Sequence, residues 1–158
     1  MGNIFSGSEI VEIGIQIEKN GKDFYNTAAA KSKNLEAKEL FQFLAGEEEK
    51  HIKTFQAILS SVEKYEPAEA YPGEYFAYMN ALASEYVFTQ KDIGERIAKA
   101  SKTDKEVVDK GIGFEKDSII FYEGMKKSVP EFDIKIIDQL IVQEQSHLKK
   151  LTELKTKL

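Results

Sequence analysis

The chain contains no cysteine, which excludes disulfides, thiolate zinc sites, iron–sulfur clusters and cysteine nucleophiles. Any metal ion must therefore be bound through oxygen and nitrogen atoms. Proline is nearly absent as well, with three residues among 158, so long uninterrupted helices are permitted over most of the chain. Pro67, Pro72 and Pro130 mark the expected joints between them.

The sequence also lacks a long apolar run and an excess of basic residues. No apolar run approaches the roughly 18 residues that a membrane span needs, and the N-terminus has no signal-peptide pattern. The 22 basic and 27 acidic residues are mixed along the chain and give a net charge of −5, without the basic stripe that neutralises phosphates. We therefore expect a soluble cytoplasmic protein that binds neither membranes nor nucleic acid.

Helix-start signals divide the chain into long helices. The residues from Ser6 to Glu9 and from Thr103 to Glu106 have capping-box spacing, Asn34 is a good N-cap, and Pro130 suits a first helical turn after Ser128. These signals predict helices at about 6–31, 34–63, 103–127 and 128–158. With 42% hydrophobic residues, the chain can bury a sizeable core, and we expect one all-α domain over residues 1–158, a four-helix bundle.

Residues 64–102 form a connection that is too long for a turn between the second and third helices. We expect it to be partly helical and to return the chain along the bundle. Its aromatic residues more often cover a core or form a dimer contact than bind a cofactor, and a homodimer or higher homo-oligomer is the expected assembly. These aromatic residues are Tyr71, Tyr75, Phe76, Tyr78, Tyr86 and Phe88.

The two halves of the chain repeat one pattern. Glu18 and Tyr25 match Glu115 and Tyr122, at an offset of 97 residues (115 − 18) and with the same spacing of seven between glutamate and tyrosine. In the other helices a Glu-x-x-His motif recurs at an offset of 96 residues (144 − 48). The chain therefore consists of two related helix pairs.

Each Glu-x-x-His motif interrupts an apolar seam whose positions step by three and four residues. The seams are Phe41, Leu44, Glu48, His51, Phe55, Ile58 and Val62 in the second helix, and Ile137, Leu140, Glu144, His147, Leu151, Leu154 and Leu158 in the fourth. These are the chain's only two histidines, and we expect both to be metal ligands rather than hydrogen-bonded core residues. Glu47 and Glu49 fall off the seam and are expected in solvent.

Small residues flank the central glutamate of the first and third helices. Gly14 and Gly21 lie on either side of Glu18, and Gly111 and Ser118 lie on either side of Glu115. Glycine inside a helix costs about 1 kcal/mol relative to alanine. We therefore expect these positions to leave room beside the carboxylates for metal, water or a small ligand.

Four carboxylates in one bundle core would lose their hydration and repel one another. Two divalent cations balance four carboxylates and leave the imidazoles neutral. One glutamate from each of two helices, with Glu-x-x-His from each of the other two, is the ligand arrangement of di-iron and di-manganese carboxylate bundles. The predicted ligands are Glu18, Glu48, His51, Glu115, Glu144 and His147, with Glu48 and Glu144 expected to bridge. These donors suit iron, manganese or zinc.

Over essentially its whole length the sequence resembles the rubrerythrin branch of the ferritin-like superfamily. The residues that carry the resemblance are Phe114-Glu115-Lys116-Asp117, Phe121-Tyr122 and Glu48-Glu49-Lys50-His51. The resemblance implies a ferritin-like bundle with two iron ions that reduces peroxide or O2, or oxidises Fe(II). The chain departs from a usual rubrerythrin in two respects. It has no cysteine-rich rubredoxin-like tail, which implies a separate electron donor, and it has Ser118 in place of a further glutamate, which brings the ligand set closer to six-ligand bacterioferritin-like centres.

Tyr25 and Tyr122 follow Glu18 and Glu115 by one heptad. They are candidates to hydrogen-bond a metal ligand, and the alternative is that they are ordinary core aromatics. For the whole protein three hypotheses remain at this stage. The leading one is a di-iron oxidoreductase; the others are a non-catalytic iron-handling protein and a bundle with a structural di-metal site.

Overall fold

The computed structural model of the chain describes residues 6–65 and 73–158, which are helical almost throughout and contain no strand. The all-α prediction is therefore confirmed. The four long helices are α1 (Gly7–Lys31), α2 (Leu35–Tyr65), α5 (Asp104–Met125) and α6 (Glu131–Lys155). The shorter elements are α3 (Gly73–Glu85), the 3₁₀ turn η1 (Val87–Thr89), α4 (Ile93–Ala100) and the 3₁₀ turn η2 (Lys126–Ser128).

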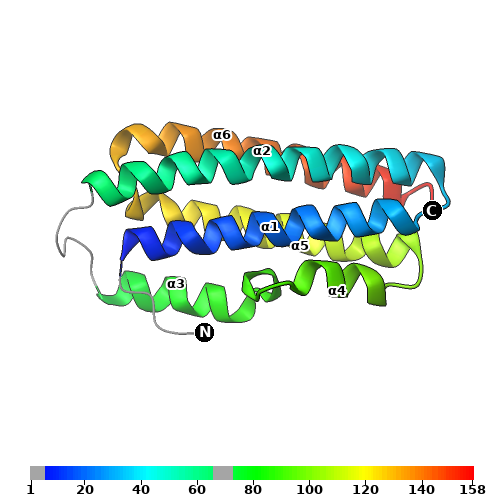
Figure 1. The fold of residues 1–158 in the computed structure, drawn as a ribbon, viewed down its shortest axis with the longest axis horizontal. Coiled ribbons are helices and arrows are strands. Elements are labelled where there is room, and N and C mark those ends of the chain that lie inside the picture. Colours follow the sequence, from blue (N-terminus) through cyan, green and yellow to red (C-terminus); the bar gives the residue numbers. More distant parts are fainter. Residues whose placement is uncertain (1–5, 66–72) are drawn as a thin grey trace.

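The connection between the two helix pairs returns the chain along the bundle, as predicted. Figure 1 shows α3 and α4 lying one after the other along the side of the bundle formed by α1 and α5. As a result α2 and α5 run in the same direction, while α1 packs chiefly on α2 and α5 on α6. The two helix pairs that repeat in the sequence are thus also the two most closely packed pairs.

Three of the four predicted helix starts are confirmed by their caps. The side chains of Ser6, Asn34 and Thr103 accept hydrogen bonds from the backbone N–H three residues later, at 3.3, 3.0 and 3.1 Å. The prediction that the fourth helix starts at Ser128 was wrong, because α6 begins only after Pro130. The Ser128 hydroxyl instead donates to the Met125 carbonyl at 2.7 Å within η2.

Two predicted helix ends also differ from the structure. The second helix continues two residues beyond the predicted end, to Tyr65, whereas the fourth stops at Lys155. Leu158 was assigned to the apolar seam, but it is exposed because it follows the end of α6.

The connection is fastened to α1 by two polar side chains. Buried Asn20 donates to the carbonyls of Phe88 and Gln90 at 2.5 and 2.6 Å and accepts from the Gly94 N–H at 3.2 Å. Lys31 donates to three carbonyls at the C-terminus of α4, those of Ala98, Lys99 and Ser101 at 2.7 to 2.9 Å. These contacts satisfy backbone groups that a helix end would otherwise leave without partners.

The connection's aromatic residues mostly belong to the core rather than to the surface. Tyr75, Tyr86 and Phe88 are buried, whereas Tyr78 is half exposed. The rings of Phe88 and Phe114 lie 4.7 Å apart in an edge-on contact. Tyr71 lies outside the described residues.

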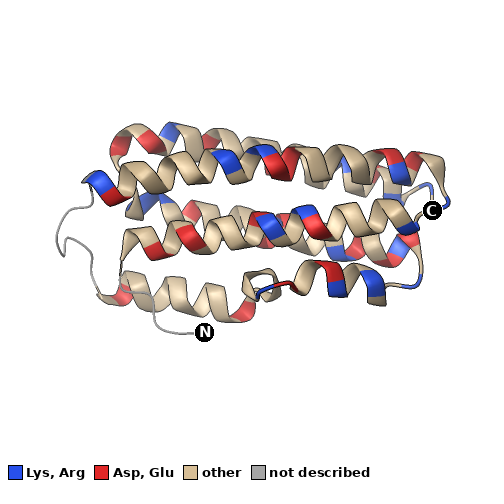
Figure 2. Ribbon diagram, viewed as in Figure 1, with Lys and Arg blue, Asp and Glu red and all other residues tan. Residues whose placement is uncertain are grey.

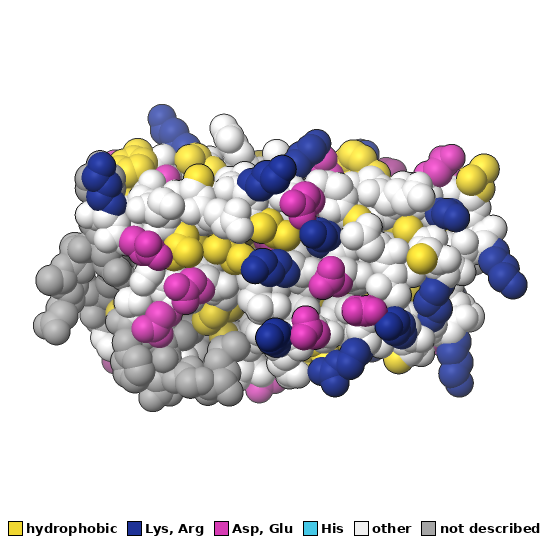
Figure 3. Space-filling view, in the orientation of Figure 1, with side chains coloured by type: hydrophobic (Ala, Val, Ile, Leu, Met, Phe, Trp, Pro, Cys, Tyr) yellow, Lys and Arg dark blue, Asp and Glu magenta, His cyan; other side chains and the backbone are white. Residues whose placement is uncertain are grey.

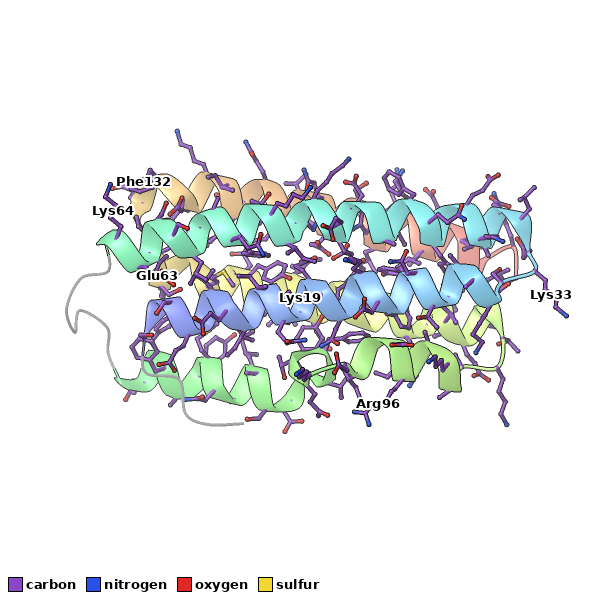
Figure 4. All side chains as sticks on the ribbon, in the orientation of Figure 1. Lys19, Lys33, Glu63, Lys64, Arg96 and Phe132 are labelled. Atoms are coloured by element: carbon purple, nitrogen blue, oxygen red, sulfur yellow. The ribbon has the colours of Figure 1, made fainter. Side chains whose placement is uncertain are left out.

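The surface carries charges of both signs. Figure 2 shows acidic and basic residues interspersed along the helices, and Arg96 of α4 points away from the bundle in Figure 4. On the face drawn in Figure 3, charged side chains surround small apolar areas and no histidine is visible. None of the helices in the described parts of the chain has the length and apolar character needed to cross a membrane.

Candidate metal centre

The six predicted ligand residues meet in the interior at mid-length of the four long helices. Their oxygen and nitrogen atoms form two overlapping groups, each with all ligand atoms within 4.8 Å of one another. The first group is Glu18, Glu48, His51 and Glu144, and the second is Glu48, Glu115, Glu144 and His147. Glu48 and Glu144, the two residues that were expected to bridge, are the members that both groups share.

The two histidines aim the same ring nitrogen at the carboxylates. The Nδ1 atom of His51 lies 2.8 Å from Glu144 Oε1 and 3.4 Å from Glu18 Oε2. The Nδ1 atom of His147 lies 3.3 Å from Glu48 Oε1 and 3.6 Å from Glu115 Oε1. The two imidazoles are nearly parallel, with ring centroids 5.8 Å apart.

The cluster contains nearly all the unsatisfied buried polar atoms found in the described residues. Nine buried side-chain oxygen and nitrogen atoms there have no hydrogen-bond partner, and eight of them belong to the six clustered residues. Both oxygens of Glu48 and of Glu144 and the Nδ1 atoms of both histidines are among them. Buried polar groups are normally satisfied. Eight converging lone-pair donors that form no hydrogen bond fit a site for metal ions.

Two tyrosines hold the outer carboxylates from the opposite half of the chain. Tyr25 of α1 donates to Glu115 Oε1 of α5 at 2.8 Å, and Tyr122 of α5 donates to Glu18 Oε1 of α1. The sequence predicted that these tyrosines could reach a ligand, and the structure shows that each reaches the glutamate of the other helix. Each outer glutamate therefore keeps one oxygen, Oε2, without a protein partner.

The electrostatics of the cluster reflect four carboxyl groups in one dry volume. Burial, reinforced by neighbouring carboxylates, raises the pKa of Glu48 and of Glu144 well above the usual value. Burial likewise raises the pKa of Glu115 to about 7. Burial opposes the charged form of His51, but the Glu18 and Glu144 carboxylates outweigh it and raise its pKa to about 11. Burial also opposes the charged form of Glu18, but the hydrogen bond with Glu48 and the His51 imidazole outweigh it and lower the pKa of Glu18. The cluster thus favours protons on Glu48 and Glu144 and a charged Glu18.

The small residues beside the outer glutamates do not leave open space, and this expectation was wrong. A Cβ atom at Gly21 would lie 2.4 Å from the Phe114 ring, and one at Gly14 would lie 2.7 Å from the Met125 methyl. At Gly111 a Cβ would approach the Tyr25 hydroxyl to 3.2 Å. The glycines therefore make room for core side chains, and Gly111 makes room for the tyrosine that binds Glu115.

The buried Ser118 hydroxyl bonds to a tyrosine of the connection. It lies 2.7 Å from the Tyr86 hydroxyl, which donates to the Phe114 carbonyl at 2.9 Å. The position where usual rubrerythrins carry a further glutamate thus serves here to join α5 to the connection through Tyr86.

The prediction that Glu47 lies in solvent was wrong, and Gln143 was not predicted to be a neighbour of the cluster. The Glu47 side chain is only 17% exposed, and its Oε2 lies 3.9 Å from His147 Nε2. On the facing helix, Gln143 Oε1 lies 2.6 Å from His51 Nε2. The internal repeat could have revealed this pair, because residues 47 and 143 are separated by the same 96 residues as the two Glu-x-x-His motifs.

Comparison with known proteins places this cluster in a family. The rubrerythrin family profile matches residues 9–155 of the chain. A crystal structure from Thermotoga maritima, provisionally described as a ferritin-like diiron-carboxylate protein, superposes with a TM-score of 0.75 at 29% sequence identity, covering 99% of this chain and 98% of that one. No curated protein sequence matches.

Proposed function

The chain belongs to the rubrerythrin family, and we propose that its six clustered glutamates and histidines hold two iron ions at which peroxide or O2 is reduced. The observation that carries the proposal is the convergence of eight buried oxygen and nitrogen atoms, none of which forms a hydrogen bond, from six residues in two overlapping groups. The diiron-carboxylate description of the structurally similar Thermotoga maritima protein supports it.

The residues present fit two divalent cations. Glu18 and His51 would serve one ion and Glu115 and His147 the other, with Glu48 and Glu144 between the two. Four carboxylates and two neutral imidazoles balance four positive charges, and the same residues without cations have to retain protons to remain buried together. Carboxylate and imidazole donors suit iron, and the family favours it.

Iron would supply the one-electron redox chemistry that no amino-acid side chain in this cluster can provide. Peroxide takes up two electrons and two protons and gives two waters, so two iron ions match its demand for electrons. The ligand residues are at most 2% exposed, which admits only a small oxidant. Tyr25 and Tyr122 would keep Glu115 and Glu18 in place, and the electrons would come from a separate donor or from Fe(II) itself.

The proposal is tested by loading the protein with Fe(II) without oxygen and mixing it with peroxide or O2 in a stopped-flow spectrometer. We expect fast oxidation of two Fe(II) per chain in the natural protein, and at least tenfold slower oxidation in Glu115→Ala because one ligand to one ion is lost. Absence of iron oxidation, or an unchanged rate in Glu115→Ala, would refute the proposal. Glu123→Ala, an exposed glutamate of α5, is the matched control.

An iron-oxidising or iron-handling role is the second candidate, and one observation favours it. Ser118 bonds to Tyr86 and adds no seventh ligand to the four glutamates and two histidines of the cluster, so the ligand set differs from that of a usual rubrerythrin. The same experiment separates the two roles when a reductant is present. Repeated peroxide consumption indicates catalysis, whereas a single oxidation of the bound iron indicates handling.

A further inference from the structure

The outer nitrogen of each histidine faces a polar side chain on the opposite helix of the α2–α6 pair. His51 of α2 has its Nε2 atom 2.6 Å from Gln143 Oε1 of α6. His147 of α6 has its Nε2 atom 3.9 Å from Glu47 Oε2 of α2. Residues 47 and 143 occupy equivalent places in the two halves of the chain, so the two contacts are related by the same internal repeat as the cluster itself.

These contacts decide which nitrogen can bind a cation. An imidazole that gives the Nδ1 lone pair to a metal must carry its proton on Nε2. An acceptor oxygen beside Nε2 stabilises that tautomer and holds the ring in one orientation. Gln143 supplies such an oxygen to His51 at hydrogen-bond distance, and Glu47 directs a carboxylate oxygen toward the same nitrogen of His147.

Gln143 and Glu47 differ in charge and in distance from the imidazole, although they are equivalent in the repeat: Gln143 is at hydrogen-bond distance and Glu47 only at ion-pair distance. Gln143 is a neutral amide, whereas Glu47 is a carboxylate whose other oxygen bonds to Lys50 at 2.9 Å. Lys50 is 75% exposed, and an ion pair in solvent is weak, so Glu47 keeps most of its effect on His147. The negative charge of Glu47, 3.9 Å from His147 Nε2, favours a proton on that nitrogen and a cation on the other side of the ring, whereas the neutral Gln143 offers only a hydrogen-bond acceptor.

We infer that Gln143 and Glu47 are positioning residues for His51 and His147, and that their difference in charge makes the two cation positions unequal. The position served by His147 is the tighter one. This inference rests on the proposed function, because it requires that the six clustered residues bind two cations.

Titration with Co(II), followed by its visible absorption, tests the inequality. We expect the natural protein to bind two Co(II) in two resolved steps. Glu47→Gln should weaken the tighter step about tenfold, so that the two steps merge. Glu49→Gln is the matched control, because this neighbouring glutamate pairs with Lys22 instead, at 2.9 Å, and its variant should titrate like the natural protein.

The second half of the test concerns Gln143. Gln143→Leu removes the acceptor and should weaken the other step about tenfold, whereas Gln143→Glu retains an acceptor and should bind at least as tightly as the natural protein. Gln145→Leu, an exposed glutamine two residues further along α6, is the control for a leucine on this surface. If Glu47→Gln and Gln143→Leu both leave the two steps within twofold of the natural protein, the inference is overturned.

Nitrogen NMR of the metal-free protein distinguishes failure of the roles inferred for Gln143 and Glu47 from failure of the proposed function. In the natural protein the His51 Nε2–H should show the shift of a hydrogen-bonded proton, which Gln143→Leu abolishes and Gln143→Glu restores. If the natural protein does not bind two Co(II), the proposed function fails and the unequal cation positions fail with it, while the NMR result still decides whether Gln143 positions His51. An unchanged His51 signal in Gln143→Leu overturns that role as well.

Discussion

Two buried tyrosines in this bundle each bind a glutamate of the opposite half of the chain. Tyr122 of α5 stabilises Glu18 of α1, and Tyr25 of α1 stabilises Glu115 of α5. A buried carboxylate that loses such a donor keeps the cost of its desolvation without the compensating bond. The tyrosine hydroxyls are therefore part of what allows these carboxylates to be buried.

Replacing Tyr122 by phenylalanine should lower the free energy of unfolding of the metal-free protein by about 2 kcal/mol, because Glu18 loses its hydrogen-bond donor. Urea unfolding in the presence of a chelator measures the difference. Tyr78→Phe is the control, since Tyr78 is half exposed on α3, and it should change stability by less than about 0.5 kcal/mol. Equal stabilities of the Tyr122 and Tyr78 variants would contradict this role for Tyr122.

The backbones of α4 and α1 lie close together at Gly94. A Cβ atom at Gly94 would lie only 2.0 Å from the Asn20 backbone carbonyl, and backbone cannot move aside as a flexible side chain can. Gly113, in the middle of α5, has no atom within 4 Å of the equivalent position. The two glycines thus have opposite roles, one required for packing and the other only weakening its helix.

We expect Gly94→Ala to lower the free energy of unfolding by about 2 kcal/mol, because overpacking pushes α4 away from α1. Gly113→Ala should raise it by about 1 kcal/mol, because alanine favours the helix and meets no neighbour. Thermal and urea unfolding of both variants check the prediction. If Gly94→Ala proved more stable than the natural protein, α4 would be able to move away from α1 without lowering the free energy of unfolding, which would contradict the prediction.

The elements and the ligand cluster followed from the sequence because both depend on local spacing. Capping residues defined the helix starts, and the seam periodicity placed Glu48 and His51 on the buried face. The sequence could not show what fills the space beside Gly21 or which glutamate Tyr25 reaches, because those contacts join residues about 90 positions apart. Glu47 was misplaced for the same reason, since only the position of α6 shows that a residue beside the seam of α2 faces His147.

For the molecule as a whole, the buried cluster links stability to pH. Glu48, Glu144, Glu115 and His51 have a higher pKa in the folded protein than in the unfolded chain. Folding therefore takes up protons above about pH 4.5, and stability falls as the pH rises through these windows. The contribution of Glu115 to stability is lost by about pH 7, and that of His51 is lost only at about pH 11.

We predict that the metal-free protein is more stable against urea at pH 5 than at pH 8.5. Burial lowers the pKa of His147, which opposes the trend below its ordinary value of 6.5. Added metal should reverse the trend, because cations compete with protons for the same atoms and bind more tightly at higher pH, and a ligand at a hundred times its Kd adds about 2.7 kcal/mol. Equal stability at both pH values without metal would contradict the prediction.

The exchanged tyrosine bonds have a consequence for how the two halves of this chain can change over evolutionary time. The repeat indicates that one helix pair was duplicated, and duplicated units normally diverge freely. Here a substitution at Tyr25 disturbs the glutamate of the second unit, and one at Tyr122 disturbs that of the first. Selection acting on either glutamate therefore constrains both copies, which is consistent with a glutamate and a tyrosine seven residues apart in each.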